Sequence, residues 1–360
     1  MEEFSMKTKV ISGPGSVKAL SELGSKRLMV VSDPYFEKNG TAEKLARLSG
    51  AAETTIYNQV QPDPTVEQVA RGTAAVKAFE PDTVVALGGG SAMDCAKAMV
   101  WFAGRAVCFV AIPTTSGSGS EVTDFAVLTH GGVKHPLVDK ALRPDIAILD
   151  SDLLKELPKK LIADSGFDVL AHALEASAAT GAGAVTDALA RAAFSEAVQA
   201  LPLSWAGNLK ARDKMHEAST MAGMAFTQAG LGLCHAMAHA LGGLFHLPHG
   251  RLCAILLPAV IGINSRQAGA KYARLAREAG FGGSADTVAV RNLKNGIIRL
   301  RRELEMPGTL AEAGIDPGQV WQSAKVIVEA TLADGCCRTN PVKVEDFMIR
   351  RVLDEVTGRV

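Results

Sequence analysis

The sequence predicts an α/β N-terminal domain with a parallel, variant Rossmann-like sheet, followed by an all-α C-terminal domain. The chain has 360 residues, which is too long for one ordinary hydrophobic core. Its first 150 residues alternate short apolar runs with helical or turn-rich segments, as in a parallel sheet covered by helices. After about residue 155, alanine, leucine, glutamate and arginine dominate and β-branched runs become rare. We therefore expect one domain over 1–155 and a second over 156–360.

Four apolar runs in the first domain predict buried parallel strands. They cover residues 27–33, 83–87, 107–112 and 146–150. Short runs of this kind, bounded by turn signals, are typical of strands with both faces covered. Because ligands of α/β sheets gather beyond the carboxyl ends of the strands, the segments that follow these runs are candidate binding loops.

Helical spacing of apolar residues characterises the second domain. It is clearest at residues 187–201 and 207–226. From residue 271 onward the sequence is amphipathic and charged. For that last part we expect structural helices and no catalytic residues.

The composition argues against several classes of protein. Lysine and arginine number 38, as do aspartate and glutamate, so no excess charge attracts nucleic acid or a membrane surface. The N-terminus lacks a basic region followed by an apolar run, and no apolar stretch reaches transmembrane length. The six cysteines form no CxxC pair, so we expect free thiols in a reducing cytoplasm.

A glycine-rich turn at Gly88-Gly-Gly-Ser91 predicts a phosphate-binding site. The turn follows a predicted strand and opens a helix, whose N-terminus offers N–H donors and a positive dipole to an anion. A second loop rich in glycine and hydroxyl groups, residues 113–121, follows another predicted strand. Asp33 closes an earlier strand, where its carboxylate favours a ribose hydroxyl, and hence NAD, over the 2′-phosphate of NADP. The usual G-x-G-x-x-G spacing is missing, so the site is a variant of that motif.

Two histidine-bearing segments predict a metal site. Asp168 and His172 lie four residues apart, on one face of a helix, and His235 and His239 repeat that spacing. One carboxylate and two or three imidazoles make a mixed N/O donor set for a divalent first-row transition metal. Spacing alone leaves open which of His235, His239, His246 and His249 are ligands. We place His249 in a turn just past a helix, and Cys234 points away from the face that carries His235.

Four motifs together resemble the iron-dependent (group III) alcohol dehydrogenases. They are Gly88-Gly-Gly-Ser with Asp94 and Lys97, the loop at 113–122, the segment 166–175, and His235 to His249, in the family's order and spacing over nearly the whole chain. Residues 62–65 and 214–230 most resemble the propanol dehydrogenases of propanediol-utilisation microcompartments. The resemblance implies a fold like that of dehydroquinate synthase and the iron-containing alcohol dehydrogenases.

The resemblance also implies roles for individual residues. Asp168, His172, His235 and His249 match the family's metal ligands, and His239 matches a catalytic histidine near the nicotinamide, while His246 has no assigned role. The implied NAD-binding residues are Asp33, Gly88, Gly89, Gly90, Ser91, Asp94, Thr114, Thr115, Ser118 and Lys134. Three departures from the usual pattern, Phe167, Val169 and Ser118, bear on substrate preference rather than on the chemistry.

The implied reaction is reversible hydride transfer between NADH and a short aldehyde such as acetaldehyde or propionaldehyde. Fe(II) serves as the Lewis acid, with zinc as the alternative metal, and the proton comes from water, a ribose hydroxyl or His239. The resemblance implies a cytoplasmic homodimer, enclosed or not in a microcompartment with an aldehyde dehydrogenase or shell partner. Two alternatives remain: a zinc- and NAD-dependent glycerol dehydrogenase or dehydroquinate-synthase-like enzyme, and a non-catalytic, metal-bound microcompartment protein.

Overall fold

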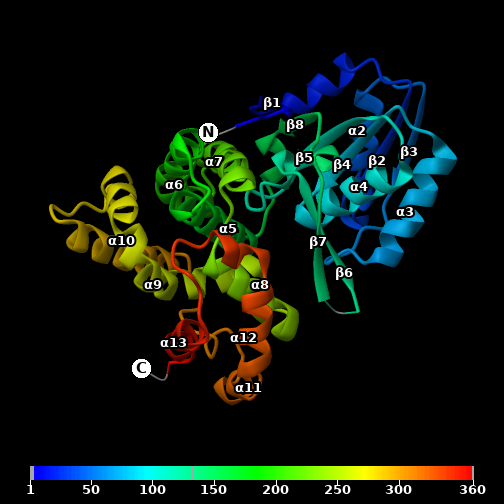
Figure 1. Cartoon of the computed structure of the whole chain (residues 1–360). Coiled ribbons are helices and arrows are strands. Elements are labelled where there is room, and N and C mark those ends of the chain that lie inside the picture. Colours follow the sequence, from blue (N-terminus) through cyan, green and yellow to red (C-terminus); the bar gives the residue numbers. More distant parts are fainter. Residues whose placement is uncertain (1–3, 132, 359–360) are drawn as a thin grey trace. The chain divides into compact units, whose positions relative to one another are not determined.

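The structure, a computed structural model, describes residues 4–131 and 133–358 and divides the chain between Leu157 and Pro158. We call the part spanning Ser5–Leu157 the sheet unit and the part that begins at Pro158 the helical unit (Figure 1). Each is described by itself below.

The sheet unit alternates strands with helices. Its strands are β1 (Lys9–Ser12), β2 (Arg27–Ser32), β3 (Glu53–Tyr57), β4 (Thr83–Gly88), β5 (Cys108–Pro113), β6 (Phe125–His130), β7 (Val133–Val138) and β8 (Ile146–Leu149). Its α-helices are α1 (Pro34–Lys38), α2 (Thr41–Leu48), α3 (Val66–Phe79) and α4 (Gly90–Ala103). Short 3-10 helices are η1 (Ser16–Glu22), η2 (Ser120–Val122), η3 (Lys140–Leu142) and η4 (Ser151–Leu154).

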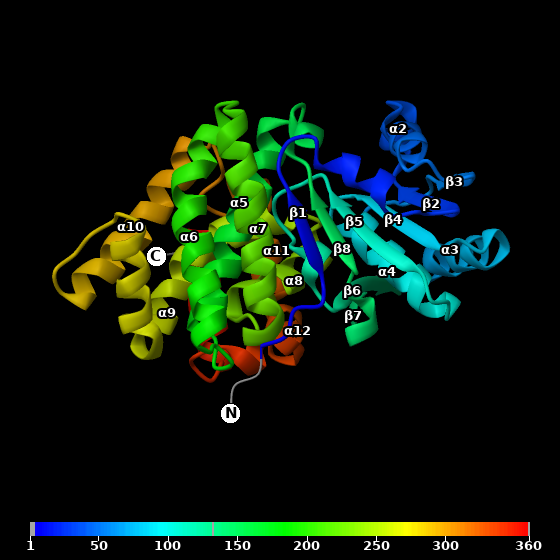
Figure 2. The same cartoon turned by 90° about the horizontal axis from the view of Figure 1, so that it is seen from above.

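Six of these strands form one parallel sheet in the order β1-β8-β5-β4-β2-β3 (Figure 2). The four predicted strands are confirmed as β2, β4, β5 and β8, which are the four inner strands of this order. The strand that follows β2 in the chain, β3, lies beside it on one side, whereas the strand that follows β4, β5, lies beside β4 on the other side. The strand order therefore reverses between β2 and β4, and α/β sheets bind their ligands at such a point.

Alternate residues of the inner strands enter two hydrophobic cores. Met29 and Val31 face one core together with α3 and α4, whereas Leu28 and Val30 face the other together with α2 and η1 (Figure 2). Successive side chains of a strand point to opposite faces, so a strand covered on both sides must be apolar throughout. This is the continuous apolar pattern on which the strand prediction rested.

The sequence did not predict four of the strands, β1, β3, β6 and β7. β1 and β3 are the edge strands of the sheet, and their half-exposed residues include polar ones. β6 and β7 form a separate antiparallel hairpin, whose register pairs Phe125 with Val138 and Thr129 with Lys134. None of these segments has the long apolar run of a buried strand, because each keeps part of its surface in solvent.

The helical unit contains the remaining elements, and the helices predicted at 187–201 and 207–226 are confirmed. They are α5 (Lys159–Ala178), α6 (Ala184–Trp205), α7 (Leu209–Ala229), α8 (Leu233–Phe245), α9 (His249–Glu278), α10 (Asp286–Glu303), α11 (Pro317–Gln322), α12 (Ala324–Ala333), η5 (Gly335–Thr339) and α13 (Asp346–Thr357). α5 packs against α6, α7 and α9. It is buried along almost its whole second half, as expected of a helix enclosed on all sides.

α9 is long and apolar enough to cross a membrane by length and composition alone, although the sequence predicted no such stretch. Its most apolar 18-residue window is 67% buried inside the structure. Burial of this extent is typical of a core helix, and α9 packs against α5, α8 and α10.

Candidate active site

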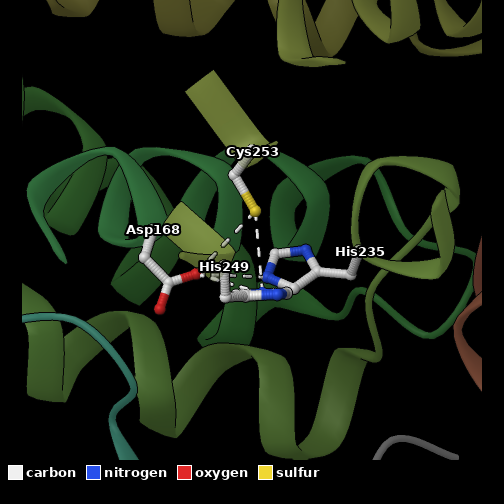
Figure 3. A group of neighbouring side chains, drawn as sticks. All are labelled: Asp168, His235, His249 and Cys253. Carbon is white, nitrogen blue, oxygen red and sulfur yellow. Dashed lines mark hydrogen bonds and ion pairs between the residues drawn. The ribbon is translucent and has the colours of Figure 1, made fainter. Parts of the chain in front are cut away.

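The helical unit gathers three histidine side chains around one carboxylate oxygen. Oδ1 of Asp168 lies 3.5 Å from Nε2 of His249, 3.6 Å from Nε2 of His235 and 3.8 Å from Nε2 of His172. α5 supplies Asp168 and His172, α8 supplies His235, and α9 supplies His249. Figure 3 shows Asp168, His235 and His249 converging on one point together with Cys253.

These separations fit a metal ion better than direct hydrogen bonds. Ligands about 2.1 Å from a metal in tetrahedral geometry lie about 3.4 Å apart, whereas an N–H···O hydrogen bond spans about 2.9 Å. Nε2 of His235 is buried and makes no hydrogen bond to any described residue. A buried polar atom of this kind requires a partner. The donor chemistry, one carboxylate with three imidazoles, also suits a divalent transition metal.

The electrostatics of the cluster call for a positive charge at its centre. Burial disfavours the charged form of Asp168, but the three imidazoles outweigh it and hold the pKa of Asp168 well below its usual value. Burial likewise opposes charge on His235, yet the nearby carboxylates of Asp168 and Glu175 raise the pKa of His235 to about 10. A proton or a metal cation at Nε2 supplies the charge that these two carboxylates stabilise.

Glu175 fixes His235 and the start of α8. Its carboxylate accepts hydrogen bonds from the backbone N–H groups of Gly232, Cys234 and His235, at 3.1, 2.7 and 3.4 Å. It also bonds Nδ1 of His235 at 2.6 Å. Because a carboxylate only accepts, Nδ1 carries the proton and Nε2 is left to face Asp168. A buried carboxylate at a helix N-terminus further stabilises α8 through the helix dipole.

Two glycines, Gly232 and Gly250, allow the starts of α8 and α9 to pack closely against neighbouring residues. A Cβ on Gly232 would lie 2.6 Å from Oδ1 of Asn340, which itself accepts the N–H of Leu233 at 3.0 Å. A Cβ on Gly250 would lie only 1.8 Å from the carbonyl oxygen of Asp164 on α5. A side chain at 232, three residues before His235, would displace the side chain of Asn340, and one at 250, directly after His249, would push α9 away from α5.

His239 has a different partner from the metal-binding candidates. Its Nδ1 lies 2.9 Å from Oδ2 of Asp334, and the ring stacks on that of His249 with centroids 5.1 Å apart. Burial would raise the pKa of Asp334, but the bond to His239 outweighs it and lowers that pKa to about 2. His246 is exposed and ends α8 in a left-handed conformation, with φ 55°.

The sequence reading missed three residues of this site. Glu175 follows Asp168 by seven residues, on the same helical face, so the spacing rule applied to Asp168 and His172 also points to it. Cys253 follows His249 by four residues, but the sequence was interpreted as a turn there, whereas His249 is the first residue of α9. No local signal indicated Asp334. Asp334 lies beyond residue 271, where we expected structural helices without catalytic residues, and it bonds His239.

The sheet unit places the predicted cofactor-binding segments at one edge of the sheet. Asp33 directly follows β2, the Gly88–Ser91 turn ends β4, and the loop with Thr114, Thr115 and Ser118 follows β5. These three strands are neighbours, so their carboxyl ends bring the loops together. The arrangement is that of a dinucleotide site in a doubly wound sheet.

The Gly88–Ser91 turn lies against the loop that follows β5. A Cβ on Gly89 would lie 3.3 Å from Oγ1 of Thr115, and one on Gly90 would lie 3.3 Å from Cβ of Ser118. Gly88 has a φ of 148°, a conformation that side-chain-bearing residues rarely adopt. α4 begins at Gly90 without a side-chain cap, which leaves its first N–H groups for an anion.

Three further candidates for the cofactor site have partners within the sheet unit. The carboxylate of Asp94 accepts hydrogen bonds from Oγ of Ser120 at 2.7 Å and from the N–H of Val127 at 3.0 Å, so it braces the loop. Lys134 pairs with Asp63 at 2.7 Å. Asp33 caps α1 by accepting the N–H of Tyr35 at 2.8 Å. Asp94 thus supports the loop through hydrogen bonds. Direct contact of Asp94, Lys134 and Asp33 with a cofactor stays a prediction.

Comparison with known families covers both units. Residues 7–151 match the family described as "Iron-containing alcohol dehydrogenase". Residues 162–356 match the family described as "Fe-containing alcohol dehydrogenase family, C-terminal". The chain belongs to the iron-containing alcohol dehydrogenase family. It is therefore an enzyme, an oxidoreductase whose substrates are alcohols and aldehydes, rather than a non-catalytic protein.

Relatives of known activity cover nearly the whole chain. It is 42% identical to the 1-propanol dehydrogenase PduQ of Citrobacter freundii, over 99% of this chain and 100% of that one. It is 36% identical to an NADPH-dependent butanol dehydrogenase of Clostridium saccharobutylicum, over 98% of this chain and 97% of that one.

Solved structures agree with the fold. An iron-containing alcohol dehydrogenase of Thermococcus thioreducens has a TM-score of 0.92 at 33% identity, covering 99% of this chain and 100% of that one. A sulfoacetaldehyde reductase of Bifidobacterium kashiwanohense in complex with NAD+ has a TM-score of 0.91 at 27% identity, covering 100% of both chains. The predicted fold class, an α/β domain followed by helices, is confirmed.

Proposed function

We propose that this protein is an NAD(H)- and Fe(II)-dependent alcohol dehydrogenase that reversibly reduces short aldehydes, such as propionaldehyde and acetaldehyde, to primary alcohols. The single observation that carries the proposal is the set of three imidazole nitrogens 3.5–3.8 Å from Oδ1 of Asp168. Asp168, His172, His235 and His249 would hold the metal. The family description supports iron over zinc for that position.

Each residue of the site has a chemical task in this proposal. Asp168 would offset part of the metal charge, and the three imidazoles would hold the metal through Nε2. When bound, iron supplies a Lewis acid at the carbonyl oxygen and NADH supplies the hydride. His239 is the proton donor and acceptor. Its Nδ1 is committed to Asp334, so Nε2 is the nitrogen that exchanges a proton with substrate or water.

The sheet unit would bind the dinucleotide. The free N–H groups at the start of α4 suit its pyrophosphate, and the hydroxyl groups of Thr114, Thr115 and Ser118 line the neighbouring loop. Asp33 supports NAD over NADP, because a carboxylate repels the 2′-phosphate. The similar sulfoacetaldehyde reductase binds NAD+, whereas the butanol dehydrogenase uses NADPH, so the choice needs a direct measurement.

One of the similar relatives favours a three-carbon substrate. The 42% identity to a 1-propanol dehydrogenase supports propionaldehyde as the first substrate to test. The likeness of residues 62–65 and 214–230 to microcompartment propanol dehydrogenases supports a cytoplasmic location, enclosed or not in such a compartment, and analogy with the family supports a homodimer. An aldehyde dehydrogenase or a shell protein is then the expected partner.

The test is the variant His249→Ala in anaerobically purified protein supplied with Fe(II). We expect loss of bound iron and of NADH oxidation with propionaldehyde, while NADH still binds. His246→Asn is the matched control, because His246 is an exposed histidine of the same segment and asparagine tolerates its left-handed backbone. The control should keep iron and activity. Full activity of His249→Ala without bound metal would contradict the proposal.

A further inference from the structure

Cys253 lies among the metal-binding candidates although neither the sequence analysis nor the proposed function uses it. Its Sγ is 3.6 Å from Nε2 of His249 and 4.0 Å from Oδ1 of Asp168. One donor atom from each of Asp168, His235, His249 and Cys253 lies within 4.8 Å of the other three. Figure 3 shows the thiol pointing into the space between the carboxylate and the two imidazoles.

The fold places this thiol firmly. Cys253 is one helical turn after His249 on α9, so both side chains point from the same face of the helix. The residue is completely buried, and the close contact of Gly250 with α5 fixes the first turn of α9. Arg251 strengthens this contact through two hydrogen bonds to Asp164, at 3.1 and 2.8 Å. Little movement of the thiol is therefore available.

The distances match those between ligands of one metal. With a metal–sulfur bond of about 2.3 Å and a metal–nitrogen bond of about 2.1 Å, an angle of about 110° at the metal separates the two ligand atoms by about 3.6 Å. This is the observed distance between Sγ of Cys253 and Nε2 of His249. A second buried thiol, that of Cys234, lies nearby but contacts the carbonyl oxygen of Cys253 at 3.8 Å. Only the Cys253 thiol belongs to the group of candidate ligand atoms.

We propose that Cys253 binds the metal as a thiolate, making the centre a mixed N/O/S site with five donors from the chain. This rests on the proposed metal site of Asp168, His172, His235 and His249. On binding, a sulfur–metal bond forms and the thiol proton passes to solvent, as is general for cysteine ligands. A thiolate is a soft donor, so the site binds zinc and cobalt more strongly than the same site without sulfur.

Co(II) is the probe, because cobalt reports its ligands in its absorption spectrum. Metal-free, full-length protein is titrated with Co(II) under anaerobic conditions. We expect visible d–d bands from the bound ion and, in addition, a near-ultraviolet charge-transfer band from thiolate to cobalt. In Cys253→Ser the charge-transfer band should disappear and the affinity for Co(II) should fall at least about tenfold. Cys253→Ala is the second variant, since it removes every donor atom at this position.

Cys234→Ser is the matched control, because it alters a buried thiol that contacts the carbonyl oxygen of Cys253 but lies outside the group of candidate ligand atoms. It should keep the charge-transfer band. Wild-type protein that binds Co(II) with d–d bands alone would overturn the role of Cys253 and leave the metal site standing. Loss of the band in the Cys234 variant would also overturn the assignment. Absence of any cobalt binding would instead contradict the proposed function.

Discussion

Replacing Glu175 by glutamine tests how the chain holds its metal-binding histidine. The carboxylate accepts four hydrogen bonds, one at Oε1 from Cys234 and three at Oε2 from Gly232 and from the backbone and Nδ1 of His235. Glutamine keeps the size of the side chain, but its amide has one oxygen instead of two. The best arrangement places that oxygen where Oε2 was and turns the NH₂ group toward the N–H of Cys234.

The expected loss of stability in Glu175→Gln follows from these hydrogen bonds. One buried N–H is left without an acceptor, which costs about 1–3 kcal/mol, and loss of the negative charge at the start of α8 costs about 0.3–1 kcal/mol more. We therefore expect Glu175→Gln to lower the free energy of unfolding of the metal-free protein by roughly 1–4 kcal/mol. The imidazole of His235 also loses its charged partner, so metal affinity should fall about 10–100-fold.

The assays are chemical unfolding of the metal-free protein and a competitive metal titration. Glu278→Gln is the matched control, because Glu278 is a half-exposed carboxylate that bonds Arg191 and Arg274 far from any metal ligand in sequence. An exposed pair contributes little, so the control should lose less than about 1 kcal/mol and no metal affinity. Unchanged stability and metal affinity in Glu175→Gln would refute the positioning role of Glu175.

Three further predictions concern other parts of the chain. Asp334→Asn should lower kcat at least about tenfold, which is part of the roughly 10²–10⁴-fold that a positioned proton donor contributes. Its iron content should stay that of wild type. An unchanged kcat would argue against a role for the pairing of Asp334 with His239. Asp33→Ser keeps a helix cap but removes a negative charge, so the ratio of kcat/KM for NADPH to that for NADH should rise about tenfold. Burial lowers the pKa of Lys97 from 10.5 to about 8, so the native state binds fewer protons than the unfolded state between these values. The stability of wild type relative to that of Lys97→Met should therefore rise with pH across that window, as unfolding titrations of both proteins from pH 7.5 to about 10.5 will show.

The sequence predicted the inner part of the sheet because burial on both faces leaves a continuous apolar run. β2, β4, β5 and β8 each carry such a run, and their boundaries were correct within one residue. The edge strands β1 and β3 and the hairpin of β6 and β7 keep polar, half-exposed residues, so no such pattern marks them. Their pairing depends on contacts between distant segments, which local composition does not encode.

The candidate site was predictable only where its residues share one helix. Asp168 and His172 are four residues apart, and spacing placed them on one face. The same rule singled out His235 and His239, but the structure gives these two histidines different partners, Asp168 and Glu175 for one and Asp334 for the other. A partner 95 residues away leaves no trace in local spacing.

The start of α9 shows how one local error hides a functional residue. The proline and glycine that flank His249 suggested a turn, whereas proline at the N-cap and glycine in the first turn are compatible with a helix start. Once His249 is placed in the helix, Cys253 follows on the same face. The glycine at position 250 is there for close packing against α5, a reason that only the three-dimensional contact reveals.

The most direct test of the metal centre is an anomalous difference map collected at the iron absorption edge from crystals grown anaerobically with Fe(II). The account predicts one strong peak about 2.0–2.3 Å from Oδ1 of Asp168 and from Nε2 of His172, His235 and His249. A map with no peak among these four residues, from protein that oxidises NADH with propionaldehyde, would contradict it.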